Sequence, residues 1–262
     1  MRLAPGDLFV TTRKKPTDAE DADARAFATR HGLPFTERLG RSIAHHLREM
    51  GRSAALVLRT DAIHLVTAEA RLGFHPNMAA RRIAGRGSQG DHYLAVAGIC
   101  PGDHVLDCTC GMGADAISAS HAVGETGRVV ALEAAPILAD IVARGMRQYA
   151  HGTDELRAAM RRVEIIATPA APYLAALPDN AFDVVAFDPM FAWPQKGAHG
   201  LDLVRAFAVD DVPDPALLDE ARRVARRAVV MADGAPGPRL ESLNIPIVSR
   251  DRRRWWGKLD AG

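Results

Sequence analysis

The tetrapeptide Asp188-Pro189-Met190-Phe191 combines residue types that could hold a planar amine for alkylation. The apolar residues 184–187 before it predict a buried strand that ends where the acid appears. The Asp188 side chain and nearby backbone carbonyls, such as that of Pro189, can accept hydrogen bonds from an amine. The Phe191 ring can stack on the heterocycle that carries the amine. An ordinary exit from a strand would explain the tetrapeptide equally well, so its interpretation depends on a second motif.

The second motif is a glycine-rich turn after another apolar strand. Gly111 and Gly113 allow positive φ angles and close approach of a ligand to the backbone, and a helix over residues 114–122 follows. The spacing also fits a dinucleotide fingerprint, but Asp107 stands before the glycines and would repel a pyrophosphate at the helix N-terminus. The ammonium and sulfonium groups of S-adenosylmethionine would be attracted instead. We therefore predict a site for S-adenosylmethionine rather than for NAD.

Two further strands end in polar residues. Residues 128–132 lead into Glu133 about twenty residues after the turn, where an acid bonds a ribose hydroxyl in nucleotide-binding α/β folds. Glu133 could also stabilise the start of the next helix through the helix dipole, and both roles can hold together. Residues 163–166 lead into Thr168. In methyltransferases this turn lies beside the adenine, and Thr168 with backbone groups would replace the Asp that commonly sits there.

Strands and helices alternate after residue 90, which predicts an α/β fold with a seven-stranded, mostly parallel sheet. Ligands bind such sheets at the carboxyl ends of the strands, where Asp107, Glu133, Thr168 and Asp188 would lie. We expect helices on both faces and an antiparallel pair at the end of the chain. The expected strands are residues 104–108, 128–132, 163–167, 183–187, 227–232, 245–249 and 253–260.

Residues 1–90 predict a small N-terminal α/β extension, and residues 91–262 the domain that binds S-adenosylmethionine. In the extension, Thr17 and Glu20 form a capping box that opens a helix. Such a unit commonly orients a substrate rather than performing chemistry. The other expected elements are a strand at 8–12, a helix at 42–50 and a hairpin formed by residues 54–58 and 63–66.

The charge of the chain is nearly balanced, with 33 Lys and Arg residues, 32 Asp and Glu residues and a formal net charge of +1. This balance gives no strong indication of a nucleic-acid partner, although a local basic surface would be enough to bind one. Arginines do cluster, and solvated helix and loop faces are the simpler explanation. The clusters are Arg81-Arg82 with Arg86, Arg222-Arg223 with Arg226-Arg227, and Arg250 with Arg252-Arg253-Arg254 before Trp255-Trp256.

The sequence indicates neither a membrane segment nor a metal site. No apolar run reaches the roughly 18 residues of a membrane span, and the first residues lack the apolar core of a signal peptide. Cys100, Cys108 and Cys110 lack the paired spacing of a zinc site, so we expect small buried side chains in a reducing compartment. We therefore expect a cytoplasmic protein with no membrane partner. The oligomeric state is left open.

From about Phe74 to its end, the chain resembles the bacterial small-subunit ribosomal RNA guanine methyltransferases of the RsmJ type. It resembles the Gram-positive relatives of that family still more closely. Met190, where many amino-methyltransferases have a second Pro, is typical of this group. The resemblance is carried by Phe74-His75-Pro76-Asn77-Met78-Ala79, Gly85-Arg86-Gly87, Asp107-Cys108-Thr109, Gly113-Ala114-Asp115-Ala116 and Asp188-Pro189-Met190-Phe191 with Gln195-Lys196.

The resemblance implies a Rossmann-like class I methyltransferase fold. It also implies an enzyme that uses S-adenosyl-L-methionine and acts on the exocyclic amine of a guanine in small-subunit ribosomal RNA. We expect direct in-line transfer that leaves S-adenosyl-L-homocysteine, with Asp188, Pro189 and Phe191 as catalytic residues. The expected cofactor-binding residues are Asp107, Thr109, Gly111, Gly113, Ala114, Asp115, Glu133, Ala134, Thr168, Pro169, Ala170 and Asp188. The expected substrate-binding residues are His75, Arg86, Met190, Gln195 and Lys196, with a structural role for His75 as the favoured alternative.

Two departures from the family pattern bear on the substrate. The ribosomal enzymes tend to have Lys or Arg directly after the fifth strand, where this chain has Met231-Ala232-Asp233. The run Ala192-Trp193-Pro194 after Phe191 is also unusual. Both positions would border the substrate, so a methyltransferase that acts on a small molecule or peptide stays an alternative. A non-catalytic cofactor-binding module is a third alternative, which the intact Asp188 and Phe191 disfavour.

Overall fold

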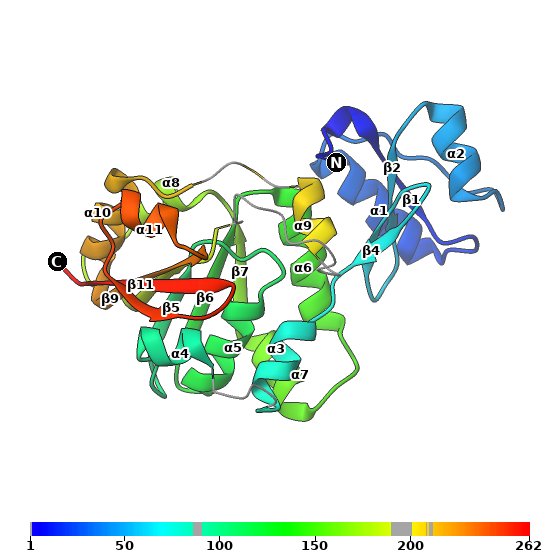
Figure 1. The fold of residues 1–262 in the computed structure, drawn as a ribbon. Helices are drawn as coiled ribbons and strands as arrows, with labels where there is room; N and C mark the ends of the chain where they lie inside the picture. Colours follow the sequence, from blue (N-terminus) through cyan, green and yellow to red (C-terminus); the bar gives the residue numbers. More distant parts are fainter. Residues whose placement is uncertain (1, 86–90, 190–200, 208, 210–211) are drawn as a thin grey trace. The chain divides into compact units, whose positions relative to one another are not determined.

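The computed structural model describes residues 2–85, 91–189, 201–207, 209 and 212–262 (Figure 1). The chain divides into two compact units. The first comprises Met1–His75, Pro136–Tyr149 and Ala198–Ala208, and the second comprises Pro76–Ala135, Ala150–Gly197 and Val209–Gly262. The separate N-terminal extension expected to end near residue 90 stays a prediction.

Within its described residues, the first unit contains a small mixed sheet with flanking helices. Its strands are β1 (Leu8–Thr12), β2 (Ala54–Leu58), β3 (Ile63–Val66) and β4 (Arg71–Gly73), and its helices are η1 (Pro5–Asp7), α1 (Asp18–Arg30), α2 (Ile43–Met50), α6 (Pro136–Gln148) and α9 (Leu201–Phe207). The strand order is β1-β2-β3-β4; β1 and β2 are parallel, and the other two pairs are antiparallel. The predicted β2–β3 hairpin is confirmed. A strand of three residues such as β4 is too short to show a period of two in the sequence.

The predicted capping box sets the start of α1. Thr17 Oγ1 accepts a hydrogen bond from the Glu20 backbone N–H at 3.2 Å, and Glu20 Oε2 accepts one from the Thr17 backbone N–H at 2.9 Å. Each side chain thus satisfies a backbone donor that the first turn of a helix leaves free. Every residue of β1 and β2 is buried, and Phe9, Leu47, Ala55 and Val57 form an apolar cluster in this unit.

The second unit is built on a seven-stranded sheet with the order β10-β11-β9-β8-β5-β6-β7. Its strands are β5 (His104–Asp107), β6 (Arg128–Glu133), β7 (Val163–Ala167), β8 (Phe182–Phe187), β9 (Ala225–Gly234), β10 (Ile247–Arg250) and β11 (Arg254–Asp260). The pairs from β7 through β6, β5 and β8 to β9 are parallel, and β11 is antiparallel to both β9 and β10. The predicted strands and the predicted antiparallel pair are therefore confirmed.

Helices cover both faces of this sheet, as Figure 1 shows. The helices are α3 (Asn77–Ile83), α4 (His92–Ala97), α5 (Ala114–Val123), α7 (Asp154–Arg162), α8 (Ala170–Ala175), α10 (Pro215–Val224) and α11 (Pro238–Ser242). One apolar cluster joins alternate strand residues such as Leu106, Val130 and Val185 to α8, α10 and α11. Successive strand residues point to opposite faces, and α4, α5 and α7 contact the strands on the other face. The predicted α/β fold, a mostly parallel sheet with helices on both faces, is confirmed.

The three cysteines differ in exposure. Cys108 and Cys110 are buried as predicted, whereas Cys100 is exposed, and none of the three forms a disulfide. The expectation of a buried Cys100 is wrong because the residue lies in the turn between α4 and β5, outside the packed strands. None of the described helices is long and apolar enough to cross a membrane. The described residues contain no group of three or more His, Cys, Asp or Glu side chains that could hold a metal ion.

Candidate active site

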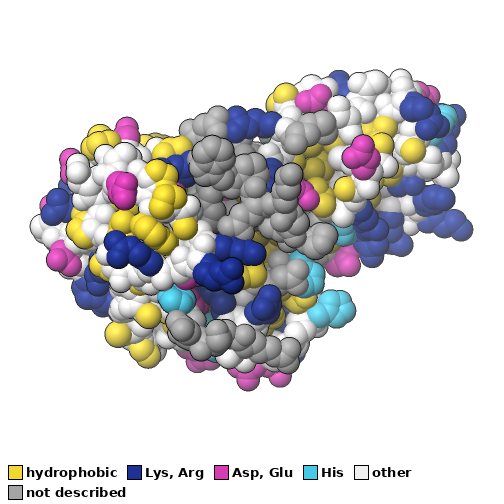
Figure 2. Space-filling view, in the orientation of Figure 1, with side chains coloured by type: hydrophobic (Ala, Val, Ile, Leu, Met, Phe, Trp, Pro, Cys, Tyr) yellow, Lys and Arg dark blue, Asp and Glu magenta, His cyan; other side chains and the backbone are white. Residues whose placement is uncertain are grey.

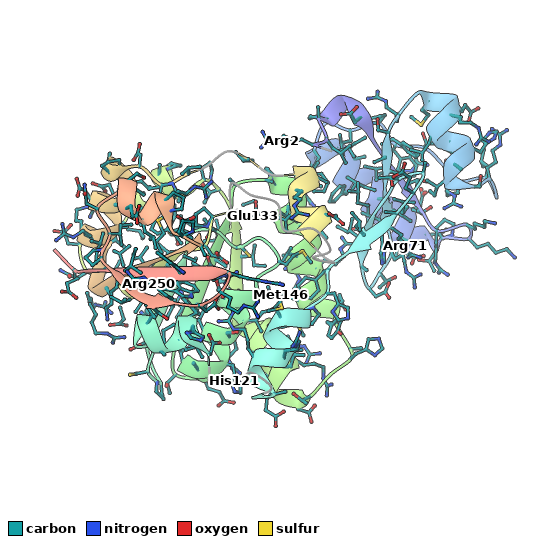
Figure 3. The ribbon with its side chains drawn as sticks, in the orientation of Figure 1. Arg2, Arg71, His121, Glu133, Met146 and Arg250 are labelled. Carbon is teal, nitrogen blue, oxygen red and sulfur yellow. The ribbon has the colours of Figure 1, made fainter. Side chains whose placement is uncertain are left out.

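The predicted site residues of the second unit gather at one edge of its sheet. Because β5, β6, β7 and β8 are parallel, their carboxyl ends meet at the same edge. Asp107 and Glu133 are the last residues of β5 and β6, Thr168 follows β7, and Asp188 follows β8. The chain order changes direction between β5 and β8, the position at which open α/β sheets bind ligands. Glu133 is labelled at the end of its strand in Figure 3.

Asp107 is a buried acidic residue with one unsatisfied side-chain oxygen. Its side chain is 2% exposed, and Oδ1 accepts a hydrogen bond from the Thr109 backbone N–H at 2.9 Å. Oδ2 has no partner among the described residues. Burial raises the pKa of Asp107 to about 8, and the nearby carboxylate of Asp115 adds to the effect. A buried acceptor without a partner costs free energy, so this oxygen is prepared for a cationic ligand such as an ammonium group.

The glycine-rich turn has the backbone conformation that the sequence predicts. Gly111 has φ of 51° and Gly113 has φ of 74°, both in the left-handed region. Gly113 is the N-cap of α5 and offers no side-chain cap to the first turn of the helix. The backbone N–H groups of that turn therefore have no capping side chain, as a ligand site at a helix start requires. Ala114 opens the helix, and Asp115 lies buried in its first turn.

The Glu133 side chain connects the glycine-rich turn to the turn that follows β6. Its Oε2 accepts a hydrogen bond from the Gly111 backbone N–H at 3.0 Å, and its Oε1 accepts one from the Ala135 backbone N–H at 3.0 Å. The second bond corresponds to the predicted role of this acid ahead of a helix, with Ala134 between the two residues. The ribose contact stays a prediction.

Thr109 connects the ends of two central strands. Its Oγ1 accepts a hydrogen bond from the Asp188 backbone N–H at 2.6 Å. The bond holds the end of β8 against the residues that follow β5, and so keeps Asp188 close to the glycine turn. Pro189 is buried behind Asp188.

The Asp188 side chain is 22% exposed and is paired with an arginine of the last strand. Arg254 Nη2 lies 3.0 Å from Asp188 Oδ2. Burial raises the pKa of Asp188 to about 6, Arg254 opposes this rise, and Asp115 adds to it. The carboxylate can thus serve as a hydrogen-bond acceptor near neutral pH, with its charge controlled by Arg254.

A buried arginine links three helices beside the site. Arg82 on α3 forms two bonds to Asp91, from Nε at 2.6 Å and from Nη2 at 2.7 Å, and it also bonds Asp115 through Nη1. The Arg82 side chain is only 17% exposed. Burial opposes its charge, but Asp115 and Asp91 outweigh that effect and raise the pKa of Arg82 above its ordinary value. The interpretation of this arginine as part of a solvated face is therefore wrong.

Two packed aromatic rings each lie close to one arginine of the site, Arg82 or Arg254. Tyr93 on α4 packs against Trp256 on β11, with ring centroids 5.4 Å apart and ring planes 30° apart. The guanidinium of Arg82 lies 5.5 Å from the Tyr93 centroid, and that of Arg254 lies 5.6 Å from the Trp256 centroid. The buried Tyr93 hydroxyl has no hydrogen-bond partner in the described part of the chain. It is a second unsatisfied polar atom of this unit.

The remaining predicted cofactor residues lie in the turn after β7. Thr168 is partly exposed, and its Oγ1 donates to the Pro169 carbonyl oxygen at 3.3 Å. Pro169 is the N-cap of α8, and Ala170 is the buried first residue of that helix. The adenine contact of this turn stays a prediction.

Of the predicted substrate residues, His75 is the one that lies among the described residues. His75 belongs to the first unit, where its Nε2 lies 3.4 Å from the Tyr149 hydroxyl. The remaining ones, together with the predicted catalytic Phe191, lie outside the described residues: Arg86, Met190, Phe191, Gln195 and Lys196.

Sequence reasoning missed Arg82, Asp91, Tyr93 and Arg254 as site residues. Asp91 carried a local signal, because it is the N-cap of α4 and accepts from the backbone N–H groups of Tyr93 and Leu94. Arg82 and Arg254 carried no local sequence signal, since each contacts the site through an acidic partner far away in the sequence.

The arrangement fits S-adenosylmethionine on two observations of this structure. The unsatisfied Asp107 Oδ2 suits the ammonium group, and the left-handed glycines allow a ligand to approach the backbone at the start of α5. The unpaired oxygen costs stability in the ligand-free protein, so a bound ligand explains its presence better than packing does.

Comparisons with known proteins show which family the chain resembles. A family model described as "Putative SAM-dependent methyltransferase" matches residues 45–253. The chain is 37% identical to the uncharacterized protein YpiP of Bacillus subtilis over 245 residues, which cover 92% of this chain and 95% of that protein. It is 30% identical to ribosomal RNA small subunit methyltransferase J of Pseudomonas paraeruginosa over 213 residues, or 79% of this chain and 78% of that enzyme.

Among solved structures, the SAM-dependent methyltransferase NGO1261 from Neisseria gonorrhoeae is similar with a TM-score of 0.66 at 18% identity. The match covers 96% of this chain and 95% of that one. At this identity the likeness shows the class I methyltransferase fold.

Proposed function

The chain belongs to the family of S-adenosylmethionine-dependent methyltransferases, and we propose that its acceptor is the exocyclic amine of a guanine in small-subunit ribosomal RNA. The observation that carries this proposal is the position of Asp188, a partly exposed carboxylate at the end of β8 beside the glycine turn. A carboxylate there can accept hydrogen bonds from an amine but cannot form bonds of the same kind to a thioether or a carbon acceptor. The relationship to ribosomal RNA small subunit methyltransferase J supports the RNA class of substrate.

The residues that would hold the cofactor are those that surround the unsatisfied oxygen. Asp107 would bind the ammonium group, Gly111 and Gly113 would admit the ligand to the backbone, and Glu133 would bind the ribose. When bound, S-adenosylmethionine would supply a methyl group on a cationic sulfur: the amine nitrogen would form a bond to that carbon as the carbon–sulfur bond breaks, S-adenosylhomocysteine would leave, and the nitrogen would release a proton. Asp107 at the end of β5 and Asp115 in the first turn of α5 are both buried, and an ionised buried carboxylate attracts a cationic ligand more strongly than an exposed one does.

Asp188 would orient the amine and stabilise the positive charge that develops on its nitrogen. Thr109 fixes the backbone of Asp188, and Arg254 keeps its side chain in one place. Positioning of this kind supplies most of the rate enhancement in a direct transfer, since no covalent intermediate needs to form. The planar ring of a guanine requires a stacking surface, for which Phe191 is the predicted residue.

One observation favours a small acceptor as a second candidate. Asp233, near which the ribosomal enzymes tend to have a basic residue, is 3% exposed in this chain. Its two oxygens accept hydrogen bonds from the backbone N–H groups of Gly234 at 2.8 Å and Arg239 at 2.7 Å. The residue therefore shapes the turn into α11 and provides no positive charge for an RNA phosphate.

The experiment that tests the proposal follows labelled methyl from S-adenosylmethionine into material from cells that lack the gene. Ribosomal RNA of the small subunit is separated from small molecules and digested to nucleosides. We expect label in an N-methylated guanosine with the wild-type protein. With Asp188→Ala the rate should fall roughly 100-fold or more, as for the loss of one well-placed polar group. Label confined to the small-molecule fraction would contradict the RNA acceptor and leave the family assignment intact.

A further inference from the structure

The turn between β10 and β11 has a fixed shape. Asp251 Oδ1 accepts hydrogen bonds from the backbone N–H groups of Arg253 at 2.6 Å and Arg254 at 2.8 Å. The Trp255 indole N–H donates to the Asp251 carbonyl oxygen at 3.2 Å. An acidic residue that bonds the backbone two and three residues ahead holds a turn in one conformation. The side chains of this turn are therefore presented in set directions.

Four arginines occupy this turn and its immediate flanks. Arg254 points to Asp188, as described above. Arg250 is exposed and its guanidinium lies 4.9 Å from the centroid of the Trp255 ring. Arg252 and Arg253 are exposed at the end of the hairpin. Figure 2 shows Lys and Arg side chains gathered over this end of the hairpin, and Figure 3 labels Arg250.

The exposed arginines of the hairpin differ from three other arginines of the same unit. Those three are paired with carboxylates: Arg223 with Asp179, Arg226 with Asp183 and Arg227 with Asp103. In the described part of the chain, Arg250, Arg252 and Arg253 form no ion pair with a carboxylate. Their positive charge is thus available to a partner, whereas the charge of the paired arginines is largely compensated within the protein.

These free charges lie next to the predicted acceptor site. Arg254 follows Arg252 and Arg253 directly in the chain and reaches Asp188 at 3.0 Å. A nucleotide whose base amine is held at Asp188 would place its own backbone close to this turn. The planar guanidinium group is suited to phosphate because it donates two parallel hydrogen bonds, and its charge adds to them.

From these observations we propose that the tip of the β10–β11 hairpin, with Arg250, Arg252 and Arg253, binds the phosphate backbone of the RNA next to the methylated nucleotide. This inference deepens the proposed function and rests on RNA being the substrate. It also explains how a chain with a net charge of +1 can bind a polyanion. The positive charge is concentrated at the entrance to the site and balanced by acidic residues elsewhere.

The test compares two double variants that each remove two positive charges. R252Q/R253Q removes the outward arginines of the hairpin. R161Q/R226Q is the matched control, since both of its arginines are exposed and lie beside the amino ends of β7 and β9, at the opposite edge of the sheet. Binding to small-subunit ribosomal RNA from cells that lack the gene is measured for both variants over a range of salt concentrations. The affinity for S-adenosylmethionine is measured in parallel.

We expect R252Q/R253Q to bind the RNA about tenfold or more weakly than the control. The slope of log affinity against log salt should decrease by about 1.4, or about 0.7 for each lost contact to a single strand. The affinity for S-adenosylmethionine should match that of the control. RNA affinity and salt slope equal to those of R161Q/R226Q would overturn the hairpin proposal.

The same measurements separate the two proposals. If the wild-type protein methylates the RNA and the hairpin variant behaves as the control does, the hairpin proposal fails and the proposed function stands. If the wild-type protein neither binds nor methylates the RNA and labels only a small molecule, both proposals fail.

Discussion

The guanidinium of Arg254 lies 3.0 Å from the carboxylate of Asp188, so a residue of the last strand controls the charge of the predicted amine acceptor. Burial alone would favour the protonated form of Asp188, and Arg82, Asp115 and Asp107 also contribute to the field at this position. A protonated carboxyl group would lose part of its capacity to accept hydrogen bonds from an amine. The position of Arg254 therefore leads to a prediction about pH.

We expect Arg254→Gln to shift the acidic limb of the pH–rate profile upward. With a pKa of about 6, Asp188 is mostly ionised at pH 7 in the wild-type protein. Loss of a neighbouring positive charge raises such a pKa by about 1 to 3 units. The variant should lose activity at pH 7 and recover toward the wild-type rate near pH 9. Arg254→Lys, which retains the charge, should keep a midpoint close to that of the wild-type protein. An equal loss at every pH would show that Arg254 does not control the ionisation of Asp188.

We expect the binding of S-adenosylmethionine to be coupled to the ionisation of the Asp107 carboxyl group. At pH 7 the group is mostly protonated, because its pKa is about 8, and the ammonium group of S-adenosylmethionine should ionise it. Binding should then release a proton and strengthen as the pH rises from 6 to 8. Calorimetry in buffers of different ionisation enthalpy measures this proton. Asp107→Asn should bind about tenfold or more weakly, without the proton release. A wild-type affinity that stays constant over this range would contradict the prediction.

The raised pKa of Asp107 also predicts how the stability of the cofactor-free protein depends on pH. Stability should fall as the pH rises, whereas cofactor affinity should increase. The pKa of Asp107 is higher in the folded protein than the ordinary value of about 4 in an unfolded chain. Its contribution to stability is fully present below that ordinary value and is lost as the pH rises toward 8. Asp107→Asn has no charge to bury, so its melting temperature should exceed that of the cofactor-free wild-type protein by several degrees at pH 8. Near pH 4 the two proteins should have the same melting temperature.

The strand ends of the second unit could be predicted from the sequence because their signals are local. Apolar runs end in Asp107, Glu133 and Asp188, and the chain itself brings these ends to one edge once the strands are parallel. The left-handed Gly111 and Gly113 follow from residue type alone.

The ion pairs of the site could not be predicted in this way. Arg82 reaches Asp115 across 33 positions of the chain, and Arg254 reaches Asp188 only because β11 inserts beside β9. In the sequence, each arginine looks like any other member of a basic cluster. Such partners depend on tertiary packing, for which a single sequence carries no periodic signal.

Arg82 leads to a prediction about folding. Its removal would leave Asp91 and Asp115, which are 12% and 8% exposed, without their cation. A buried pair broken on one side typically costs about 3–5 kcal/mol. We expect Arg82→Ala to lower the free energy of unfolding of the second unit by about this amount in a urea titration. Arg226→Ala is the control, because its ion pair with Asp183 is more exposed and should contribute about 1 kcal/mol at most. Similar losses in both variants would show that the Arg82 cluster is not a structural clamp.

The packing of Phe74 against Gly145 leaves no room for a side chain at position 145 of the first unit. A Cβ atom at this position of α6 would lie 2.3 Å from the Cβ and Cγ atoms of Phe74, closer than packed atoms can approach. Gly145→Ala should therefore destabilise the unit by about 1–3 kcal/mol, although alanine is the better helix former. Hydrogen exchange of the β1 and β2 amides is the suitable measurement, because both strands belong to the first unit.

Gly6→Ala provides the control for this steric effect, because a Cβ atom at Gly6 would meet nothing closer than 4.0 Å. It should leave the exchange rates of β1 and β2 close to those of the wild-type protein. The double variant Phe74→Ala/Gly145→Ala removes the ring that the new methyl group would strike, so Gly145→Ala should cost less in that background than in the wild-type protein. An equal cost in the two backgrounds would show that Phe74 is not what excludes a side chain at position 145.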